Sequence, residues 1–531
     1  MLAPHRRFVA WCLVSLWVGG CHRTSRDWPM HRYNAARTAN QPNKSALSDP
    51  ARVPSLHEIW RWHPAAIGDQ DLGATGPGFS ASPVVYRGRV YLGHLNGRLY
   101  ALDTSGTFLW KYPPAGAAAL VSTSMCNPSS PGIASTPAIA ANIGGSPAVV
   151  FGAPDPASAN GDGRVWAVNA TTGTLIWRSP VVASRFNNEQ IGYDSPVIAN
   201  GRVYIGISNH CDNPIIAGKL FALDLATGAF APGFSTFVAS ATRGGGLWSS
   251  PAAAQGDVVV TTGNGCVPTN GGCGTEPSPN HALSMIRLDG TTGAMIWKFQ
   301  PVPWALDYDP DWAAIPAFHA ASCGRMMTAP MKDGYTHALN AGPAAPTGGD
   351  PAALGLSLRR WTFPQASIPF SSGSHGDIRY TRGAAVWNDV VFAVTGGRDV
   401  TVSVTAGYSR LHALNACASD HERVRWWLQF PGYGYPTLGS PSVTRGIVYV
   451  GTTTDTLYAI ADPDLVPAAG SQCDFPGVAV ADCAANGFRL TPIPAVLARV
   501  RLSGHIRTTP ALARGWLLVT TDAGFVHALK P

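Results

Sequence analysis

The sequence predicts an all-β protein whose strands form one eight-bladed β-propeller, and three observations support this. A unit of four short strands separated by Gly-containing turns recurs along the 531 residues. Trp closes most of these units, at positions 110, 177, 297, 361 and 427. The last unit stops at Pro531, one strand short. A repeat of this length with four strands per unit is typical of propeller blades.

The units follow one another from Ala81 to the C-terminus. In the first, residues 81–112, turns such as Arg87-Gly88 separate short apolar strands, which indicates an antiparallel meander. The third unit has Pro232 in place of Trp, and the eighth lacks its fourth strand. We expect the strand within residues 56–64 to complete the eighth blade and close the ring; seven blades are the alternative. The later units begin with STPAIAANIG, SPVIANGRV, SSPAAAQGD, APMKDGYTH, GAAVWNDVV, SPSVTRGIV and TPALARGWL.

Composition and charge narrow the class of protein. Apolar residues make up 45% and charged residues 13%, with 58 Gly and 44 Pro, which indicates a buried, turn-rich globular chain. The net charge is +7, but no run of Lys or Arg is long enough for a nucleic-acid stripe or a polybasic membrane patch. We therefore expect no nucleic-acid partner. The sequence also lacks the G-x-S-x-G motif of hydrolases and a Gly-rich nucleotide loop.

Residues 1–20 have the parts of an export signal: an Arg pair, an apolar run and Gly19-Gly20 before Cys21. The segment resembles a bacterial lipoprotein signal. That resemblance implies cleavage before Cys21, a lipid anchor on its thiol, and a place in the periplasm or at the outer membrane. An ordinary secretory signal that is cut nearby is the alternative. We expect residues 21–54, which are polar and rich in Pro and Asn, to form a tether and residues 55–531 to form the propeller.

Export determines how the cysteines are interpreted. Apart from Cys12 and Cys21, eight remain, and an even number in an oxidising compartment suggests disulfides. The natural local pairs are Cys266 with Cys273 and Cys473 with Cys483. No C-x-x-C motif is present for zinc and no C-x-x-C-H motif for covalent haem. The pairing of the other four cannot be deduced: Cys126, Cys211, Cys323 and Cys417.

The recurrent Trp has a physical role in such a ring. A blade buries one face against its neighbour, and a large flat side chain near the turn can wedge between the two. Burying ~150–250 Å² contributes roughly 4–6 kcal/mol at ~25 cal/mol per Å². The segments ALDTSGTFLW, AVNATTGTLIW and RLDGTTGAMIW resemble the tryptophan docking motif of the quinoprotein (PQQ-repeat) β-propeller family. That family includes enzymes that bind pyrroloquinoline quinone and lipoprotein scaffolds that bind none.

The fourth unit and the start of the fifth carry polar residues that the other units lack. The segments GLWSSP, VVVTTGNG, ALDYDPDW and MKDGYTH contain Trp248, Asn264, Asp307 and Lys332. Their order resembles that in quinone-dependent alcohol dehydrogenases, including the polyvinyl-alcohol type. The resemblance implies that Trp248 stacks on the quinone and Asn264 ligates Ca²⁺. It implies further that Asp307 is a calcium ligand and the general base, and that Lys332 binds and polarises the quinone carbonyls.

These residue types suit that chemistry. Ca²⁺ prefers six to eight oxygen ligands and withdraws electrons from the quinone as a Lewis acid. A carboxylate beside the alcohol takes its proton while hydride passes to the quinone. The family also has an acidic ligand in the third blade, which implies Asp212, with Asn213 as the alternative. Asp309 and Asp311 compete with Asp307 for its role. Each position has a structural interpretation too: core packing for Trp248, a turn for Asn264, a solvated loop for the three Asp and an exposed edge strand for Lys332.

Two functions of different classes follow. The resemblance implies a PQQ- and calcium-dependent enzyme of the bacterial envelope, which oxidises a small or polymeric alcohol and passes electrons to an external acceptor such as a cytochrome c. The alternative is a non-catalytic propeller lipoprotein of the outer-membrane assembly-factor type, which binds another envelope protein. Convergence of Asn264, Asp307 and Lys332 near the ring axis would favour the enzyme.

Overall fold

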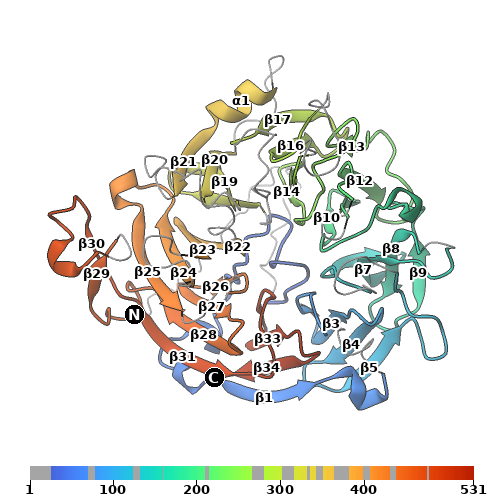
Figure 1. Cartoon of the computed structure of the whole chain (residues 1–531). Helices are drawn as coiled ribbons and strands as arrows, with labels where there is room; N and C mark the ends of the chain where they lie inside the picture. The colour runs from blue at the N-terminus through green and yellow to red at the C-terminus, as the bar shows by residue number, and fades with distance from the viewer. Residues whose placement is uncertain are drawn as a thin grey trace, which may run out of the picture.

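Eight four-stranded antiparallel sheets surround a central axis in the computed structural model (Figure 1). The predicted eight-bladed propeller is therefore confirmed. Each sheet has its innermost strand at the axis and its fourth strand on the outer wall, and each lies beside the next blade in chain order. The structure describes residues 26–69, 78–122, 132–158, 161–209, 214–265, 280–301, 316–331, 335–341, 351–363, 382–398, 407–430, 438–474 and 478–531.

The first four blades are regular meanders. Blade one contains β2 (Val84–Tyr86), β3 (Arg89–Gly93), β4 (Leu99–Asp103) and β5 (Phe108–Tyr112). Blade two contains β6 (Ala138–Ile143), β7 (Ser146–Pro154), β8 (Gly163–Asn169) and β9 (Leu175–Arg178). Blade three contains β10 (Val197–Ala199), β11 (Arg202–Ile207), β12 (Lys219–Asp224) and β13 (Phe237–Val238). Blade four contains β14 (Ala252–Ala254), β15 (Asp257–Thr261), β16 (Met285–Asp289) and β17 (Met295–Phe299).

The next three blades follow the same meander, and two of them also contain an inserted helix or hairpin. Blade five contains β18 (Ala317–Ala321), β19 (Gly324–Pro330), β20 (Thr336–Asn340) and β21 (Arg359–Phe363), with helix α1 (Pro351–Ser357) before β21. Blade six contains β22 (Arg382–Trp387), β23 (Val390–Arg398), β24 (Gly407–Asn415) and β25 (Val424–Phe430). Blade seven contains β26 (Ser442–Thr444), β27 (Ile447–Gly451), β28 (Thr456–Ala461) and β31 (Ala495–Arg501). A separate hairpin, β29 (Ser471–Cys473) and β30 (Leu490–Pro492), precedes β31.

Blade eight joins the two ends of the propeller. Its strands β32 (Ala511–Ala513), β33 (Trp516–Thr520) and β34 (Val526–Lys530) are completed by β1 (His57–Trp62), which pairs antiparallel with β34. The expected closure is therefore confirmed. Short 3₁₀ turns complete the described elements: η1 (Ala46–Ser48), η2 (Val53–Ser55), η3 (Pro64–Ile67), η4 (Arg185–Asn187), η6 (Asp420–Glu422) and η7 (Val480–Asp482).

Trp side chains dock several of the blades onto the next one in the ring. A Cβ added to Gly173 of blade two would lie 2.6 Å from the Trp110 ring of blade one, and one added to Gly228 of blade three would lie 2.4 Å from Trp177. The Trp177 indole also donates to the Leu225 carbonyl at 3.1 Å. Only glycine allows the ring to lie this close to the turn.

Two docking positions differ from the sequence pattern. In blade six the docked ring is Trp426, which is fully buried and donates to Asp462 of blade seven, and not Trp427. In blade three Pro232 replaces the Trp, and the Phe234 ring lies 3.2 Å from a Cβ built on Gly293 of blade four. A smaller aromatic ring from a neighbouring position thus fills the same place.

We expected residues 21–54 to form a tether, but from Arg26 onward this segment lies inside the ring. Its blue trace runs through the middle of the propeller (Figure 1). It bonds the innermost strand of one blade after another, and Trp28 and Arg37 are fully buried. Its backbone bonds run between Trp28 and Val85, Pro29 and Ile139, Ala35 and Ala253, Ala36 and Phe318, Thr38 and Val386, Ala39 and Val443, and Arg26 and Arg514.

Arg37 supplies the remaining contact of this segment. Its guanidinium donates to the Ser195 carbonyl of blade three at 2.9 Å, to the Pro251 carbonyl of blade four at 2.8 Å and to His31 at 2.8 Å. Burial lowers the pKa of Arg37 to about 9, so it stays charged at neutral pH. The segment therefore contacts all eight blades.

A belt of hydroxyl groups links neighbouring blades just before their first strands. The Thr509 amide donates to the Ser82 hydroxyl at 3.0 Å, and the Ser82 amide to Thr136 at 2.9 Å. The Thr136 amide donates to Ser195 at 2.9 Å, and the Ser195 amide to Ser250 at 2.8 Å. These are the Ser and Thr of the recurring Ser-Pro and Thr-Pro pairs. The belt joins the innermost strands of blades eight, one, two, three and four at one end of the ring.

The described residues contain two disulfides. Cys473–Cys483 is the local pair that the sequence indicated, and Cys323–Cys417 joins blade five to blade six. No helix among the described residues is long and apolar enough to cross a bilayer. The other cysteines that we considered lie outside the described residues: Cys12, Cys21, Cys126, Cys211, Cys266 and Cys273.

Candidate functional site

The two ends of the ring differ in their connections. We call the end where second strands lead into third strands the loop end; it carries Leu95, Ser208 and Asn264. The opposite end has two-residue turns between first and second strands, such as Arg87-Gly88 and Arg514-Gly515, and we call it the turn end. First strands start at the loop end, so the hydroxyl belt lies there too.

Two of the predicted site residues meet at the loop end of blade four. Trp248 precedes β14 and Asn264 follows β15. Gly263 N donates to Gly246 O at 2.7 Å, and Gly245 N donates to Asn264 O at 2.8 Å, which ties the two segments together. A Cβ on Gly263 would lie 2.8 Å from Trp248 Cδ1, so the glycine lets the indole pack directly on the turn. Trp248 is partly exposed.

The other predicted site residues, Asp212, Asp307 and Lys332, lie outside the described residues. The strands that flank them are described: β11 and β12, β17 and β18, and β19 and β20. Each of these pairs connects at the loop end. The positions of the three side chains relative to Trp248 and Asn264 remain a prediction.

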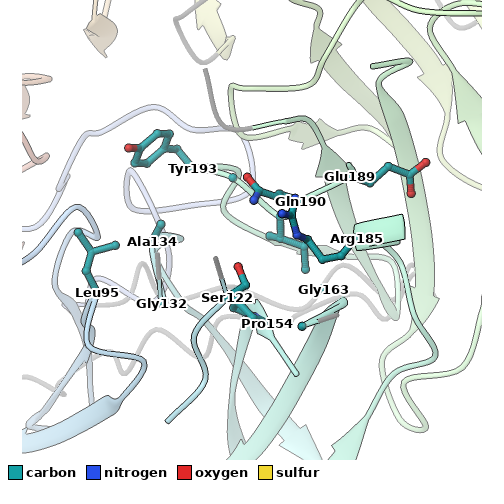
Figure 2. A pocket seen from close by; sticks show the side chains of 13 residues that line it. Leu95, Ser122, Gly132, Ala134, Pro154, Gly163, Arg185, Glu189, Gln190 and Tyr193 are labelled. Atoms are coloured by element: carbon teal, nitrogen blue, oxygen red, sulfur yellow. The ribbon is translucent and has the colours of Figure 1, made fainter. Parts of the chain in front are cut away.

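A narrow recess opens at the loop end between blades one, two and three (Figure 2). Leu95, Pro154, Arg185, Gln190 and Tyr193 are among the residues that line it. Its enclosed volume is only about 20 Å³, room for roughly one water molecule. A tricyclic quinone is much larger than this recess.

The wall of the recess continues toward Trp248. Gln190 and Ser208 exchange backbone hydrogen bonds of 2.8 and 3.1 Å, and the Leu247 amide donates to the Ile207 carbonyl at 3.1 Å. The C-terminal end of β11 and the residue after it thus contact both the recess, through Gln190, and Leu247, the residue before Trp248. The two features are parts of one continuous rim.

The two charged side chains that line the recess, Glu189 and Arg185, differ in whether they have an ion-pair partner in the described part of the chain. Glu189 points away from it in Figure 2 and forms an ion pair with Lys219 at 2.5 Å. Arg185 is half-buried, and its Nε has no hydrogen-bond partner among the described residues. Burial lowers the pKa of Arg185, and the Asp162 carboxylate acts against this. Arg185 is the recess residue that could hold a small anion.

Asp194 is a buried carboxyl that our sequence reasoning did not select. It is fully buried, and no hydrogen bond of ordinary geometry from a described residue reaches either carboxyl oxygen. A Cβ on Gly206 would lie 2.1 Å from its Oδ2 and 2.8 Å from Leu247 Cβ, which places the carboxyl beside the residue before Trp248. Burial raises the pKa of Asp194 well above its usual value, although the Gly206 peptide and the Arg37 charge lower it.

A signal for Asp194 was present in the sequence. The residue before the Ser-Pro or Thr-Pro pair is Ala, Ser, Gly or Thr in the other units that have such a pair, and Asp only at 194. An acidic residue at a position that is otherwise small marks a site that differs from the repeat. The structure adds that this acidic side chain is buried, and burial is what shifts its pKa.

The repeat family is supported by comparison with family models. The family described as outer membrane protein assembly factor BamB matches residues 57–276 and 161–307, which together span slightly less than half of the chain. No curated protein matches the sequence at a significant level.

Solved structures share the fold over nearly the whole chain. Quinohemoprotein alcohol dehydrogenase ADHIIG from Pseudomonas putida HK5 is 14% identical, with a TM-score of 0.64, covering 95% of this chain and 80% of its own. The enzyme from Comamonas testosteroni is 17% identical, with a TM-score of 0.62 over 96% and 81%. A europium-containing methanol dehydrogenase is 13% identical, with a TM-score of 0.63 over 95% and 98%. The resemblance of the repeats to the quinoprotein propeller family is therefore confirmed, and at these identities it shows the fold alone.

Proposed function

Because the chain folds as a quinoprotein-type propeller, we propose that it oxidises an alcohol with pyrroloquinoline quinone and Ca²⁺ in the bacterial envelope. The observation that carries the proposal is the contact between Trp248 and the Gly263-Asn264 turn at the loop end. The Trp248 indole packs there on Gly263, the residue before Asn264, and a flat cofactor needs an aromatic wall near the oxygen ligands of its calcium ion. The packing on Gly263 fixes the indole, so the two residues fit this role.

Each residue of the proposed site has a defined task, and Asp307 has two. Trp248 provides the wall for the cofactor, and Asn264 with Asp212 provides calcium ligands. Asp307 ligates the metal and takes the proton of the alcohol, and Lys332 polarises the cofactor carbonyls. When bound, the quinone and Ca²⁺ supply a hydride acceptor and a Lewis acid. Electrons then pass to an external acceptor such as a cytochrome c.

Reconstitution tests this function. The purified chain is mixed with the quinone and Ca²⁺, and the absorption spectrum and dye-linked oxidation of primary alcohols are recorded. Asn264→Ala and Trp248→Ala are expected to weaken cofactor uptake more than tenfold, since even an outer-shell change costs about 10–100-fold. Trp427→Ala, which removes a Trp on the outer strand of blade six, is the matched control and should keep uptake. Failure of the wild-type chain to take up the quinone with any divalent metal would overturn the proposal.

A second function is favoured by the family match. The matching model over residues 57–307 is that of an assembly factor, and BamB from Moraxella catarrhalis has the fold with a TM-score of 0.50 over 90% of this chain. As a scaffold the propeller would hold an envelope protein on its rim. That role predicts a deletion phenotype rescued fully by Asp307→Ala plus Lys332→Ala. Loss of rescue by a double variant that still folds would eliminate the scaffold.

A further inference from the structure

A second recess lies at the turn end, on the opposite side of the ring from Trp248. It is formed by the N-terminal segment and blade eight and has a volume of about 300 Å³. Three cationic side chains line it, from Arg26, Lys44 and Arg514, and none of the described lining residues is acidic. The polar residues Asn43 and Ser45 add hydrogen-bonding groups. Such a lining suits a phosphate group, because guanidinium and ammonium groups bind its oxygens strongly.

The walls of the recess are held in place before any ligand binds. The Arg514 amide donates to the Arg26 carbonyl at 2.9 Å, and the Gln41 side chain donates to the Leu512 carbonyl at 2.9 Å. Arg514 forms an ion pair with the buried Asp27. Arg26 and Lys44 are exposed and form no ion pair with another described residue. The recess is therefore preorganised and carries uncompensated positive charge.

Two further cations flank the recess on the neighbouring blades. Arg87 of blade one and Arg445 of blade seven occupy the same turn position as Arg514, with left-handed φ angles of 50°, 47° and 52°. All three are exposed, and blades seven, eight and one are adjacent in the ring. At the same end, the carboxylate of Asp103 accepts hydrogen bonds from its own turn, at Ser105 and Thr107. The positive surface, which we call the basic face, is thus Arg26, Lys44, Arg87, Arg445 and Arg514.

We infer that the basic face binds the phosphate of anionic phospholipid headgroups, so that the turn end rests on the membrane. The proposed lipid anchor at Cys21 favours a membrane, and not a dissolved ion, as the source of the phosphate. Arg26 follows Cys21 by five residues, and an extended chain spans at most about 3.6 Å per residue, so the recess is held within about 18 Å of the anchor. Each Lys or Arg near an anionic surface adds to the attraction. The loop end with Trp248 then faces away from the bilayer, open to substrate and electron acceptor.

Vesicle flotation tests the inference. The full chain is added to preformed vesicles of phosphatidylcholine and to vesicles of 70:30 phosphatidylcholine and phosphatidylglycerol. A lipid anchor or any apolar segment adds the same binding to both kinds of vesicle. The difference in binding between the two kinds therefore measures the contribution of the basic face. We expect severalfold stronger binding to the anionic vesicles, weakening with salt. Arg26→Glu plus Lys44→Glu should lower binding to the anionic vesicles at least about tenfold.

A matched pair of charge reversals controls for net charge. Arg499→Glu plus Arg501→Glu makes the same change on the exposed outer strand β31, toward the loop end, and should keep the preference for anionic vesicles. Equal binding of the wild-type chain to both vesicle types would overturn the inference, as would equal losses in the two double variants. Protection of residues 26–46 from hydrogen exchange by inorganic phosphate, without a vesicle preference, would mean a dissolved phosphate and not a lipid.

Failure of this inference can be distinguished from failure of the proposed lipid anchor and from failure of the proposed enzyme activity. Anionic preference without any binding to pure phosphatidylcholine would support the basic face and contradict the anchor at Cys21. Cofactor uptake is measured on the same variants, and Arg26→Glu plus Lys44→Glu should leave it unchanged, because the substitutions lie at the other end of the ring from Trp248.

Discussion

At the scale of single residues, Asp194 is a buried carboxyl whose titration links the stability of the protein to pH. Its pKa is raised by burial, so the folded state holds a proton that the unfolded state releases near pH 4. The stability that depends on this proton is present at low pH and is lost as the pH rises. At neutral pH the buried Asp194 carboxyl therefore lowers the free energy of unfolding. It lies beside Leu247, the residue that precedes Trp248.

We therefore predict that Asp194→Asn stabilises the protein at pH 7–8 and has little effect near pH 4. The gain is expected to grow as the pH rises above the ordinary carboxyl pKa of about 4, because only the unfolded state then releases its proton freely. Urea denaturation at several pH values measures it. The matched control is Asp224→Asn, since hydrogen bonds from Thr227 lower the pKa of Asp224, and its loss should weaken stability slightly at neutral pH. A less stable Asp194→Asn variant would show instead that Asp194 is ionised and paired with Arg37.

At the scale of secondary-structure elements, two kinds of repeated contact join neighbouring blades. The Trp rings contribute apolar burial on the outer part of each interface, and the hydroxyl belt contributes polar contacts at the innermost strands. The Trp pattern could be predicted from the sequence because its spacing is regular and its chemistry is unambiguous. The belt could not, because a Ser-Pro pair reads as a turn signal until the neighbouring blade supplies the donor.

The belt can be tested by removing one acceptor. Thr136→Val keeps the shape of the side chain but leaves the buried Ser82 amide without its acceptor, which costs about 1–3 kcal/mol. Chemical denaturation measures the loss. Thr107→Val, at an exposed turn of blade one, is the control and should change stability by less than about 0.5 kcal/mol. Equal effects in the two variants would mean that the belt does not stabilise the ring.

At the scale of the whole molecule, two segments from the N-terminal part hold the propeller together. Strand β1 closes the ring by pairing with β34, and residues 26–43 fill its middle and bond to all eight blades. The closure was predictable, because one blade lacked a strand and one spare strand was present. The filling of the centre was not, because a polar stretch rich in Pro and Asn has no periodicity that distinguishes a tether from an ordered insert.

Arg37 provides the test of this central segment. Arg37→Leu removes hydrogen bonds to blades three and four and leaves their buried carbonyls unpaired, so a loss of more than about 3 kcal/mol is expected. Thermal and urea unfolding measure it. Arg359→Leu on the exposed outer wall is the control and should be close to neutral. A wild-type melting temperature for Arg37→Leu would mean that the blades do not depend on the segment.

The sequence by itself determined the all-β class, the eight blades, the closure and the docked Trp rings, because these follow from local patterns that repeat. It also indicated the Cys473–Cys483 pair and placed Trp248 and Asn264 in one unit. Only the tertiary structure decided that Gly263 lets those two segments meet, that Asp194 is fully buried, and that scattered cations form one basic face. Burial and proximity depend on the packing of residues far apart in the chain, and no local pattern encodes them.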